Sequence, residues 1–490
     1  MSEPVKPPDP DRRRFFRQFA GEMVSSVGSV IGAAQSLQES SADAARELLG
    51  AAGPTSAVGG RAAALPGGAG VAQDASTAGW RAPFRWDGDV CRIVDQRRLP
   101  DVLVDLEIRT ASDAVRAIAD GALVGAAVQA QVAAVTLALV AARAVPSRSF
   151  ARRATIRGAA NAFRITRPGS AALAAALDRM LALVEAAGLD TPGETLAEQL
   201  HDEAERIIGE AVEDHGRLVG HAVAALPGGP ADPIHVLVAG SSGAMGGGQF
   251  GTALSAVQTV HHAGRPIHAL VAEGRPSFEG SRIAAWELRQ AGVPHAVVTD
   301  GAAPGCIAAG EVDAVLVAAD RVTANGDVVV TAGGYPLALA CGAAGIPFMV
   351  CATTSAVDAR VASGGDATIE EGRPTLVMRV GETRVMPEGT QIRNPLQEIV
   401  PAALVTVLAT EEGALRAPFG PALAGALGRA AERRADVPGI AALRAQREAA
   451  DNAAREAADQ ELDGVDDRPP GEPPPVDVAA LRNRPRAGTA

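Results

Sequence analysis

Short apolar runs alternate with stretches of helical spacing from residue 234 to residue 351. Strands that are buried on both faces and alternate with helices form a parallel sheet covered by helices. This alternation therefore predicts a Rossmann-like α/β domain. The expected strands are 234–238, 267–271, 296–298, 314–317 and 347–351, and the expected helices between them include 251–262, 281–291 and 335–344.

The sequence on either side of this block predicts the rest of the domain organisation. Residues 81–225 have mostly helical spacing and are expected to form a helical N-terminal domain, followed by the Rossmann-like parallel-sheet domain at 226–413. Residues 1–80 form an extension that ends in a Gly/Ala/Pro/Ser-rich linker, and residues 414–490 change from helical to acidic and Pro-rich sequence. Such compositions bury little apolar surface, so we expect flexible tails at both ends.

Charge and composition exclude several classes of function. A formal net charge of −12 argues against a nucleic-acid binder with a basic surface. Lys6 is the only lysine, so a phosphate must be bound by arginine, backbone amides or helix N-termini. The four cysteines and eight histidines show no metal-ligand spacing, and we therefore predict neither a metal site nor a cofactor.

Two segments bear on the location of the chain. Residues 122–142 are long enough to span a bilayer, but Gln129, Gln131 and Thr136 favour a helix buried in a protein core. The run of arginines at 12–17 loosely resembles an export signal, whereas Glu22 and the lack of a cleavage motif favour an amphipathic helix. Widely spaced thiols fit a reducing compartment, so we expect a cytoplasmic protein without membrane contact.

A glycine-rich loop follows the first expected strand. Residues 246–251 read G-x-G-x-x-G, although this fingerprint of dinucleotide-binding proteins begins seven residues too late after the strand. A glycine-rich loop that leads into a helix can bind an anion through free backbone N–H groups. Tight packing of the loop against its neighbours is the alternative, and the sequence leaves both interpretations open.

Asp320 follows the fourth expected strand, at the sheet edge where α/β proteins bind ligands. A carboxylate at a buried strand end can act as a general acid or base, because desolvation moves its pKa toward neutral pH. The alternative is a structural role, in which Asp320 caps the next turn or pairs with Arg321.

Several segments resemble one known family. They are Trp86–Val90, Asp95–Pro100, Arg167-Pro168, Leu177–Met180, Phe250–Leu254, Glu273–Pro276, Gly280–Leu288, Val298–Asp300, Ala319–Arg321, Ala324–Asp327, Gly345–Phe348 and Asn394-Pro395. In this order they resemble the family that joins methylthioribose-1-phosphate isomerase, ribose-1,5-bisphosphate isomerase and the regulatory subunits of translation initiation factor 2B. The resemblance covers residues 81–413 and implies a helical domain, a Rossmann-like domain and a homodimer.

The resemblance implies a site for a phosphorylated sugar or a nucleotide-like metabolite. In the isomerases, a cysteine and an aspartate move protons as a phosphorylated aldose becomes a ketose, a step of methionine salvage. The aspartate corresponds to Asp320, and an arginine that binds substrate phosphate corresponds to Arg167. The cysteine corresponds to Gly240, whose neighbours Ser241 and Ser242 are far weaker bases than a thiolate.

Three further positions of the family site also differ. The family's Arg-Gly-Ala phosphate motif reads Val124-Gly125-Ala126, so that its arginine is missing. A ligand-binding glutamine corresponds to Glu279, whose carboxylate would repel a phosphate. The family's Asn-Lys pair reads Val330-Thr331. We therefore expect the fold of the family with a degraded active site.

Three functions remain open on the sequence. The first is an aldose–ketose isomerase of the methylthioribose-1-phosphate type with altered chemistry at Asp320 and Ser241 or Ser242. The second is a non-catalytic, ligand-sensing or regulatory member, as the initiation factor subunits are. The third is a nicotinamide-dependent enzyme that uses the glycine-rich loop. The missing groups favour the second function, while Asp320 and the Asn325-Gly326-Asp327 turn favour the first.

Overall fold

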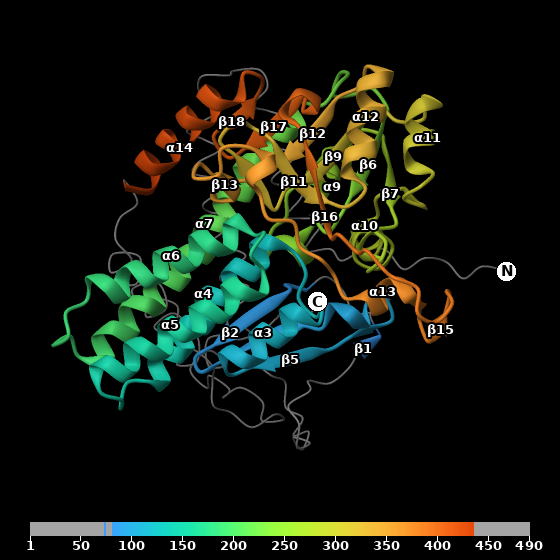
Figure 1. Cartoon of the computed structure of the whole chain (residues 1–490). Helices are drawn as coiled ribbons and strands as arrows, with labels where there is room; N and C mark the ends of the chain where they lie inside the picture. The colour runs from blue at the N-terminus through green and yellow to red at the C-terminus, as the bar shows by residue number, and fades with distance from the viewer. Residues whose placement is uncertain (1–72, 75–80, 436–490) are drawn as a thin grey trace, which may run out of the picture. The chain divides into compact units, whose positions relative to one another are not determined.

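The computed structural model describes residues 73–74 and 81–435 (Figure 1). The predictions for the rest of the N-terminal extension and for residues 436–490 lie outside the described residues. The first described element, β1 (Gln73–Asp74), pairs with β4 (Val102–Leu103) in a two-stranded antiparallel sheet.

A three-stranded antiparallel sheet opens the region that we expected to be mostly helical. Its order is β2 (Phe84–Asp87), β3 (Val90–Val94) and β5 (Asp105–Ile108), and α3 (Ala111–Ala119) follows it. The sequence prediction was incomplete here, because strands of four or five residues are too short to show a clear period. The short helix η1 (Gln96–Arg98) connects β3 to β4.

Four long helices then form the helical region, as the sequence predicted. They are α4 (Ala126–Arg143), α5 (Ser149–Thr166), α6 (Ala171–Ala186) and α7 (Gly193–Ala224). Figure 1 shows α4 side by side with α6, and α4 packs on α5, α6 and α7. By length and composition, α4 is the one described helix that could cross a membrane, but 72% of its most apolar window is buried inside the protein. Its apolar composition is therefore explained by packing against its neighbours.

Helix α7 belongs to two hydrophobic cores. Leu196, Leu200 and Ala204 in its first half pack with α4 and α6, whereas Leu218 and Ala222 in its second half pack against the large sheet. A single 32-residue helix thereby connects the helical region to the sheet.

A seven-stranded sheet forms the second half, and all five predicted strands belong to it. Its order is β18 (Gly413–Leu415), β17 (Val407–Thr410), β12 (Phe348–Cys351), β9 (Ala314–Ala318), β6 (Ile234–Ala239), β7 (Ile267–Ala272) and β8 (His295–Val298). Every pair is parallel except β17 with β18. The helices between the strands are α8 (Ala244–Gly247), α9 (Ala253–His262), α10 (Ala285–Ala291), α11 (Ala303–Ala308) and α12 (Gly334–Ala344), with a π-helical turn, η2 (Gly280–Ala284), before α10.

The central strands are buried on both faces, as their uninterrupted apolar sequence requires. In β6, Val236 and Val238 pack with α7 and α9, and Leu237 packs on the opposite face with α11 and α12. The alternation of helices and strands in the sequence is therefore confirmed as a parallel sheet with two covered faces.

A second, four-stranded sheet covers part of the site region and was not predicted. Its order is β13 (Val357–Asp358), β10 (Arg321–Thr323), β11 (Val328–Thr331) and β16 (Gln397–Val400). Between β13 and β16 lie η4 (Gly364–Asp366), α13 (Pro374–Met378) and the hairpin of β14 (Arg379–Val380) and β15 (Thr383–Arg384). The short helices η3 (Thr354–Ala356) and η5 (Ala402–Leu404) precede β13 and β17. Because β16 pairs with β11 across more than 65 residues of sequence, local pattern could not reveal this sheet.

A buried cluster of charged side chains joins α14 (Phe419–Ala435) to α7 and to the end of β17. Arg433 lies 2.8 Å from Asp214, and Arg434 donates a hydrogen bond of 3.0 Å to the same carboxylate. Glu411 accepts a 2.9 Å hydrogen bond from the backbone N–H of Thr354 and is 1% exposed. Burial, together with the nearby negative charge of Asp214, raises the pKa of Glu411 to about 7.

The free energy of unfolding is expected to fall as pH rises from about 4.5 to about 7. In this range the folded protein keeps a proton on Glu411 that the unfolded chain, with its ordinary pKa of 4.5, releases. The expected loss is on the order of 3 kcal/mol, because one pKa unit corresponds to about 1.4 kcal/mol. Denaturant unfolding at pH 5 and pH 8 measures this loss. In Glu411→Gln, the free energy of unfolding should not show this decrease between the two pH values. Glu388→Gln, at a side chain that is 92% exposed, should keep it; equal pH profiles for all three proteins would contradict the prediction.

Candidate functional site

The order of strands in the large sheet reverses beside β6. The chain passes from β6 to β7 and β8 on one side and then returns to place β9 on the other side. At such a switch point the two connections leave in opposite directions and open a crevice at the carboxyl ends of the strands. Gly240 directly follows β6, and Asp320 follows β9 after one intervening residue. Two predicted site positions therefore lie at the switch point.

Arg167 at the end of α5 contacts Asp320 across 153 residues of sequence. Its Nη2 donates a 3.2 Å hydrogen bond to Asp320 Oδ2, and its Nη1 donates a 2.8 Å hydrogen bond to Gln129 Oε1. Its Nε lies 2.7 Å from Glu370 Oε2. The structure thus brings the two predicted residues together in one network. The Arg167 side chain is 18% exposed and the Asp320 side chain is 24% exposed.

Three members of this network escaped the sequence prediction. Gln397 at the start of β16 donates to Asp320 Oδ2 through its amide nitrogen, and its Oε1 accepts a 3.2 Å hydrogen bond from the backbone N–H of Glu370. Glu370 also accepts a 2.9 Å hydrogen bond from Gly169 N. Gln129 was noted only as a polar residue in an apolar helix, which was the one available signal. Glu370 and Gln397 carry no such signal, because they reach the site through the second sheet.

Glu279 also faces the Arg167–Asp320 pair. It lies just before the turn η2, and its Oε1 accepts a 2.9 Å hydrogen bond from Ser277 Oγ. Burial raises the pKa of this carboxyl group and the negative charge of Asp320 adds to the effect, while the Arg167 guanidinium opposes it. Burial likewise raises the pKa of Glu370. One guanidinium is therefore surrounded by three carboxyl groups.

Gly240 and Thr331, at which the sequence predicted the loss of a thiol and of a lysine, are neighbours in space. Gly240 has a φ of +79°, and a Cβ placed there would lie 2.9 Å from Thr331 Oγ1. Thr331 is the last residue of β11. A glycine and a hydroxyl group thus lie side by side at these two predicted positions.

The two serines after Gly240 differ in their surroundings. Ser242 is 3% exposed, and its Oγ accepts a 3.1 Å hydrogen bond from Leu254 N, so it stabilises the loop. Ser241 Oγ is buried and has no hydrogen-bond partner among the described residues. Neither hydroxyl is hydrogen-bonded to Asp320 in the described part of the chain, so no base activates them as nucleophiles or proton carriers.

Three of the four cysteines, Cys91, Cys341 and Cys351, are buried. Cys351 lies in β12 opposite Ala318 of β9, but it is 1% exposed, and burial raises the pKa of its thiol to about 12. Burial raises the pKa of Cys91 and Cys341 to about 12 as well. Such thiols remain protonated at neutral pH and do not supply a thiolate.

The glycine-rich loop packs tightly and carries its own anion. The backbone N–H groups of Ala244 and Met245 donate to the carboxylate of Glu287 over 2.8 and 3.1 Å, and Glu287 is 1% exposed. A Cβ at Gly243 would lie 2.4 Å from Glu287 Oε2, and one at Gly251 would lie 2.3 Å from the carbonyl carbon of Gly243. Of the two interpretations left open by the sequence, the packing loop is correct. The amides of Ala244 and Met245 are therefore occupied by a carboxylate of the protein itself.

Gly125 and Ala126 approach this loop rather than Asp320. Gly125 precedes α4 with a φ of +110°, and a Cβ there would lie 2.3 Å from Gly246 O. Ala126 begins α4, which carries Gln129 one turn later. These two predicted ligand positions are therefore linked to the site through Gln129 and the loop.

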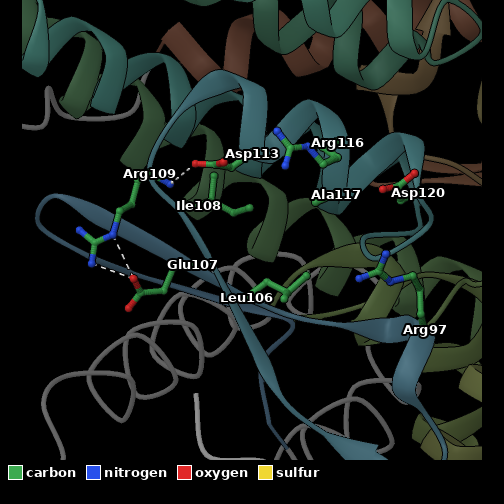
Figure 2. A pocket seen from close by; sticks show the side chains of 9 residues that line it. All are labelled: Arg97, Leu106, Glu107, Ile108, Arg109, Asp113, Arg116, Ala117 and Asp120. Atoms are coloured by element: carbon green, nitrogen blue, oxygen red, sulfur yellow. Dashed lines mark hydrogen bonds and ion pairs between the residues drawn. The ribbon is translucent and has the colours of Figure 1, made fainter. Parts of the chain in front are cut away.

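Two cavities lie outside this network. One of about 540 Å³ is formed by β5 and α3, and Figure 2 shows Arg109 turned toward Glu107 at its edge, with Arg97 and Arg116 also lining it. The other, of about 180 Å³, lies where α4, α6 and α7 meet the segment at Thr353–Ser355. Neither is lined by Asp320 or Arg167.

The fold is that of an α/β protein in which a helical region precedes a parallel sheet, and an arginine–aspartate pair lies at the switch point of the sheet. Sequence comparison leads to a family with this kind of fold. The sequence model of the Initiation factor 2 subunit family matches residues 122–417. The chain belongs to this family.

Curated relatives and solved structures agree with this assignment. A methylthioribose-1-phosphate isomerase from Synechococcus sp. is 36% identical over 350 residues, which cover 70% of this chain and 97% of the relative. The crystal structure of 5-methylthioribose 1-phosphate isomerase from Pyrococcus horikoshii is similar with a TM-score of 0.63 and 28% identity, covering 71% of this chain and 96% of that one. The delta subunit of translation initiation factor eIF-2B from A. fulgidus has a TM-score of 0.58 and 27% identity, covering 69% and 96%.

Proposed function

We propose that this chain is a member of the isomerase branch that binds a small polyhydroxylated ligand at the Asp320 site and isomerises methylthioribose 1-phosphate only at a strongly reduced rate. The contact between Gly240 and Thr331 carries the proposal. An aldose–ketose isomerisation needs one group to remove a proton beside the carbonyl and another to return it. Here only Asp320 remains of the expected pair.

Within this proposal, Arg167 and Gln397 are positioning residues for Asp320. Both donate to Oδ2, which fixes the orientation of the carboxylate. The other oxygen, Oδ1, is the atom that would take a proton from a bound sugar. Ser241 lies next to the vacated thiol position and supplies a hydroxyl for ligand binding rather than for proton transfer.

A second candidate function is regulation by ligand binding without catalysis. The likeness to the A. fulgidus initiation factor subunit supports this candidate, as does the loss of both the thiol and the ammonium group. In either case we place the protein in the cytoplasm as a homodimer, with the helical domain at 81–225, the Rossmann-like domain at 226–413 and separate tails.

A thermal-shift screen tests whether the site binds a ligand. The panel should hold pentoses, pentitols, sugar phosphates, nucleotides and a nicotinamide cofactor. A true ligand at about 100 times its Kd is expected to stabilise the folded protein by about 2.7 kcal/mol. The Asp320→Asn variant should lose most of the ligand-induced thermal shift. The control is Asp313→Asn, at a half-exposed side chain just before β9, and this variant should keep the shift. No shift with any sugar would refute the proposal, and a shift with the nicotinamide cofactor alone would favour a redox enzyme.

A further inference from the structure

The charge balance around Arg167 differs from that of a phosphate site. Three carboxyl groups, those of Asp320, Glu370 and Glu279, act on this one guanidinium. Its Nη2 and Nε already contact Asp320 and Glu370, and its Nη1 contacts Gln129. Nη1 and Nη2 of Arg167 are therefore hydrogen-bonded to groups of the protein itself, while its Nε lies beside the Glu370 carboxylate without a hydrogen bond among the described residues.

The other arginines near the site are engaged too. Arg321 lies 2.6 Å from Asp358 Oδ2 and also donates to the carbonyl oxygens of Pro168 and Gly169. Arg282 Nη1 donates to the carbonyl oxygens of Gln96 and Arg97, which holds it against η1. Among the described residues there is no lysine. Arg321 and Arg282 are therefore held by groups of the protein, and the three carboxyl groups that act on Arg167 outnumber that single guanidinium.

Of the three carboxyl groups around Arg167, Glu279 has the fewest close positive charges. It accepts a hydrogen bond from the Ser277 hydroxyl, and among the described residues no arginine or histidine nitrogen forms an ion pair with it within 4.0 Å. Asp320 and Glu370, in contrast, each have Arg167 within 3.2 Å. Glu279 is half-buried, and Arg167 and Arg282 act on it without forming an ion pair, so a ligand with a positive charge would supply a closer counter-ion.

We propose that the Asp320 site selects a polyhydroxylated ligand that carries an ammonium group, with Glu279 as the counter-ion of that group. The inference rests on the proposed function, because it names the ligand class of the same site. Hydroxyl groups of the ligand would bind Asp320 and the neighbouring polar side chains. The ammonium group would replace the phosphate, for which the arginine and the lysine expected from the resemblance are missing.

Binding of such a ligand should depend on pH. The charged groups that face Glu279 are Arg167, Asp320 and Arg282, and burial raises the pKa of the Glu279 carboxyl group. An ammonium ion favours the ionised carboxylate, so affinity should increase as pH rises through that pKa, and binding below it should release a proton. Calorimetry in two buffers of different ionisation enthalpy measures that proton.

Three probes that share a pentitol chain and carry a positive, a neutral or a negative group at C1 test the proposal. They are a 1-amino-1-deoxypentitol, the neutral pentitol and the pentitol 1-phosphate, titrated into the full-length protein by calorimetry. The amine is expected to bind about tenfold tighter than the neutral pentitol, and the phosphate about tenfold weaker, since one close charge pair in a partly screened site contributes about one decade or more. Glu279→Gln should remove most of the preference for the amine and strengthen phosphate binding, while the exposed Glu388→Gln should change neither.

The outcomes separate this inference from the proposed function. If the neutral pentitol binds and the phosphate binds as tightly or more tightly, the site still takes a sugar-like ligand and the inference on charge is wrong. If Glu279→Gln leaves the order of the three affinities unchanged, Glu279 is not the counter-ion and the inference is likewise wrong. If none of the three probes binds, both the inference and the proposed function fail.

Discussion

Turnover of methylthioribose 1-phosphate by this chain is expected to be at least about a thousandfold slower than turnover by its Synechococcus relative. Loss of a positioned proton-transfer group costs roughly 10²–10⁴ in rate. Each lost charge-assisted contact to the phosphate costs a further ~1.5–3 kcal/mol of binding free energy. On the proposed function, the groups expected to be missing correspond to Gly240, Val124 and Thr331, and Glu279 is expected to add a repulsive carboxylate. The measurement is kcat/KM of both purified proteins under identical conditions.

A variant identifies the origin of any residual turnover. Asp320→Asn removes the one remaining proton-transfer group and should abolish activity that belongs to this protein. Activity that survives in the variant comes from the expression host. A kcat/KM equal to that of the relative, together with its loss in Asp320→Asn, would overturn the proposal that the missing thiol limits the reaction.

Replacing Arg167 by methionine is expected to lower the free energy of unfolding by about 3–5 kcal/mol, because removal of one partner leaves buried charges uncompensated. Asp320, Glu370 and Glu279 would then face one another without a cation. Protonation relieves this repulsion, so the loss should be larger at pH 8 than at pH 5. Denaturant unfolding at the two pH values measures both effects.

Arg164→Met serves as the control for this substitution. Arg164 lies three residues earlier on α5 and pairs with Asp178 at the surface, where both side chains are at least 35% exposed. Such exposed pairs contribute about 1 kcal/mol or less. Equal losses for the two variants would mean that Arg167 is an ordinary surface arginine and that the network around Asp320 does not stabilise the fold.

Sequence patterns were sufficient to predict those strands that show a clear apolar run in the local sequence. The five predicted strands lie within one or two residues of their observed bounds. For β12, β9 and β6 in the middle of the sheet, the reason is that burial on both faces needs a mostly apolar run. The same argument placed Asp320 at the carboxyl edge of the sheet. The three-stranded sheet of β2, β3 and β5 was missed, since its strands are short and half-exposed.

The glycine-rich loop shows why a motif alone could not decide function. Its glycines fit a phosphate-binding loop and a packing loop equally well. The decision depends on Glu287, which lies more than 40 residues later and places its carboxylate on the loop amides. Neither spacing nor composition indicates that contact.

The sequence by itself determined the family, the parallel sheet and most of the helices that cover it. Only the tertiary structure decided which side chains surround Asp320 and Arg167. Arg167, Glu279, Asp320 and Glu370 come from four distant segments, and their shared charge balance exists only after α5, the large sheet and the second sheet pack together. Electrostatic energies depend on distance in space and on burial, and neither quantity can be read from the order of residues along the chain.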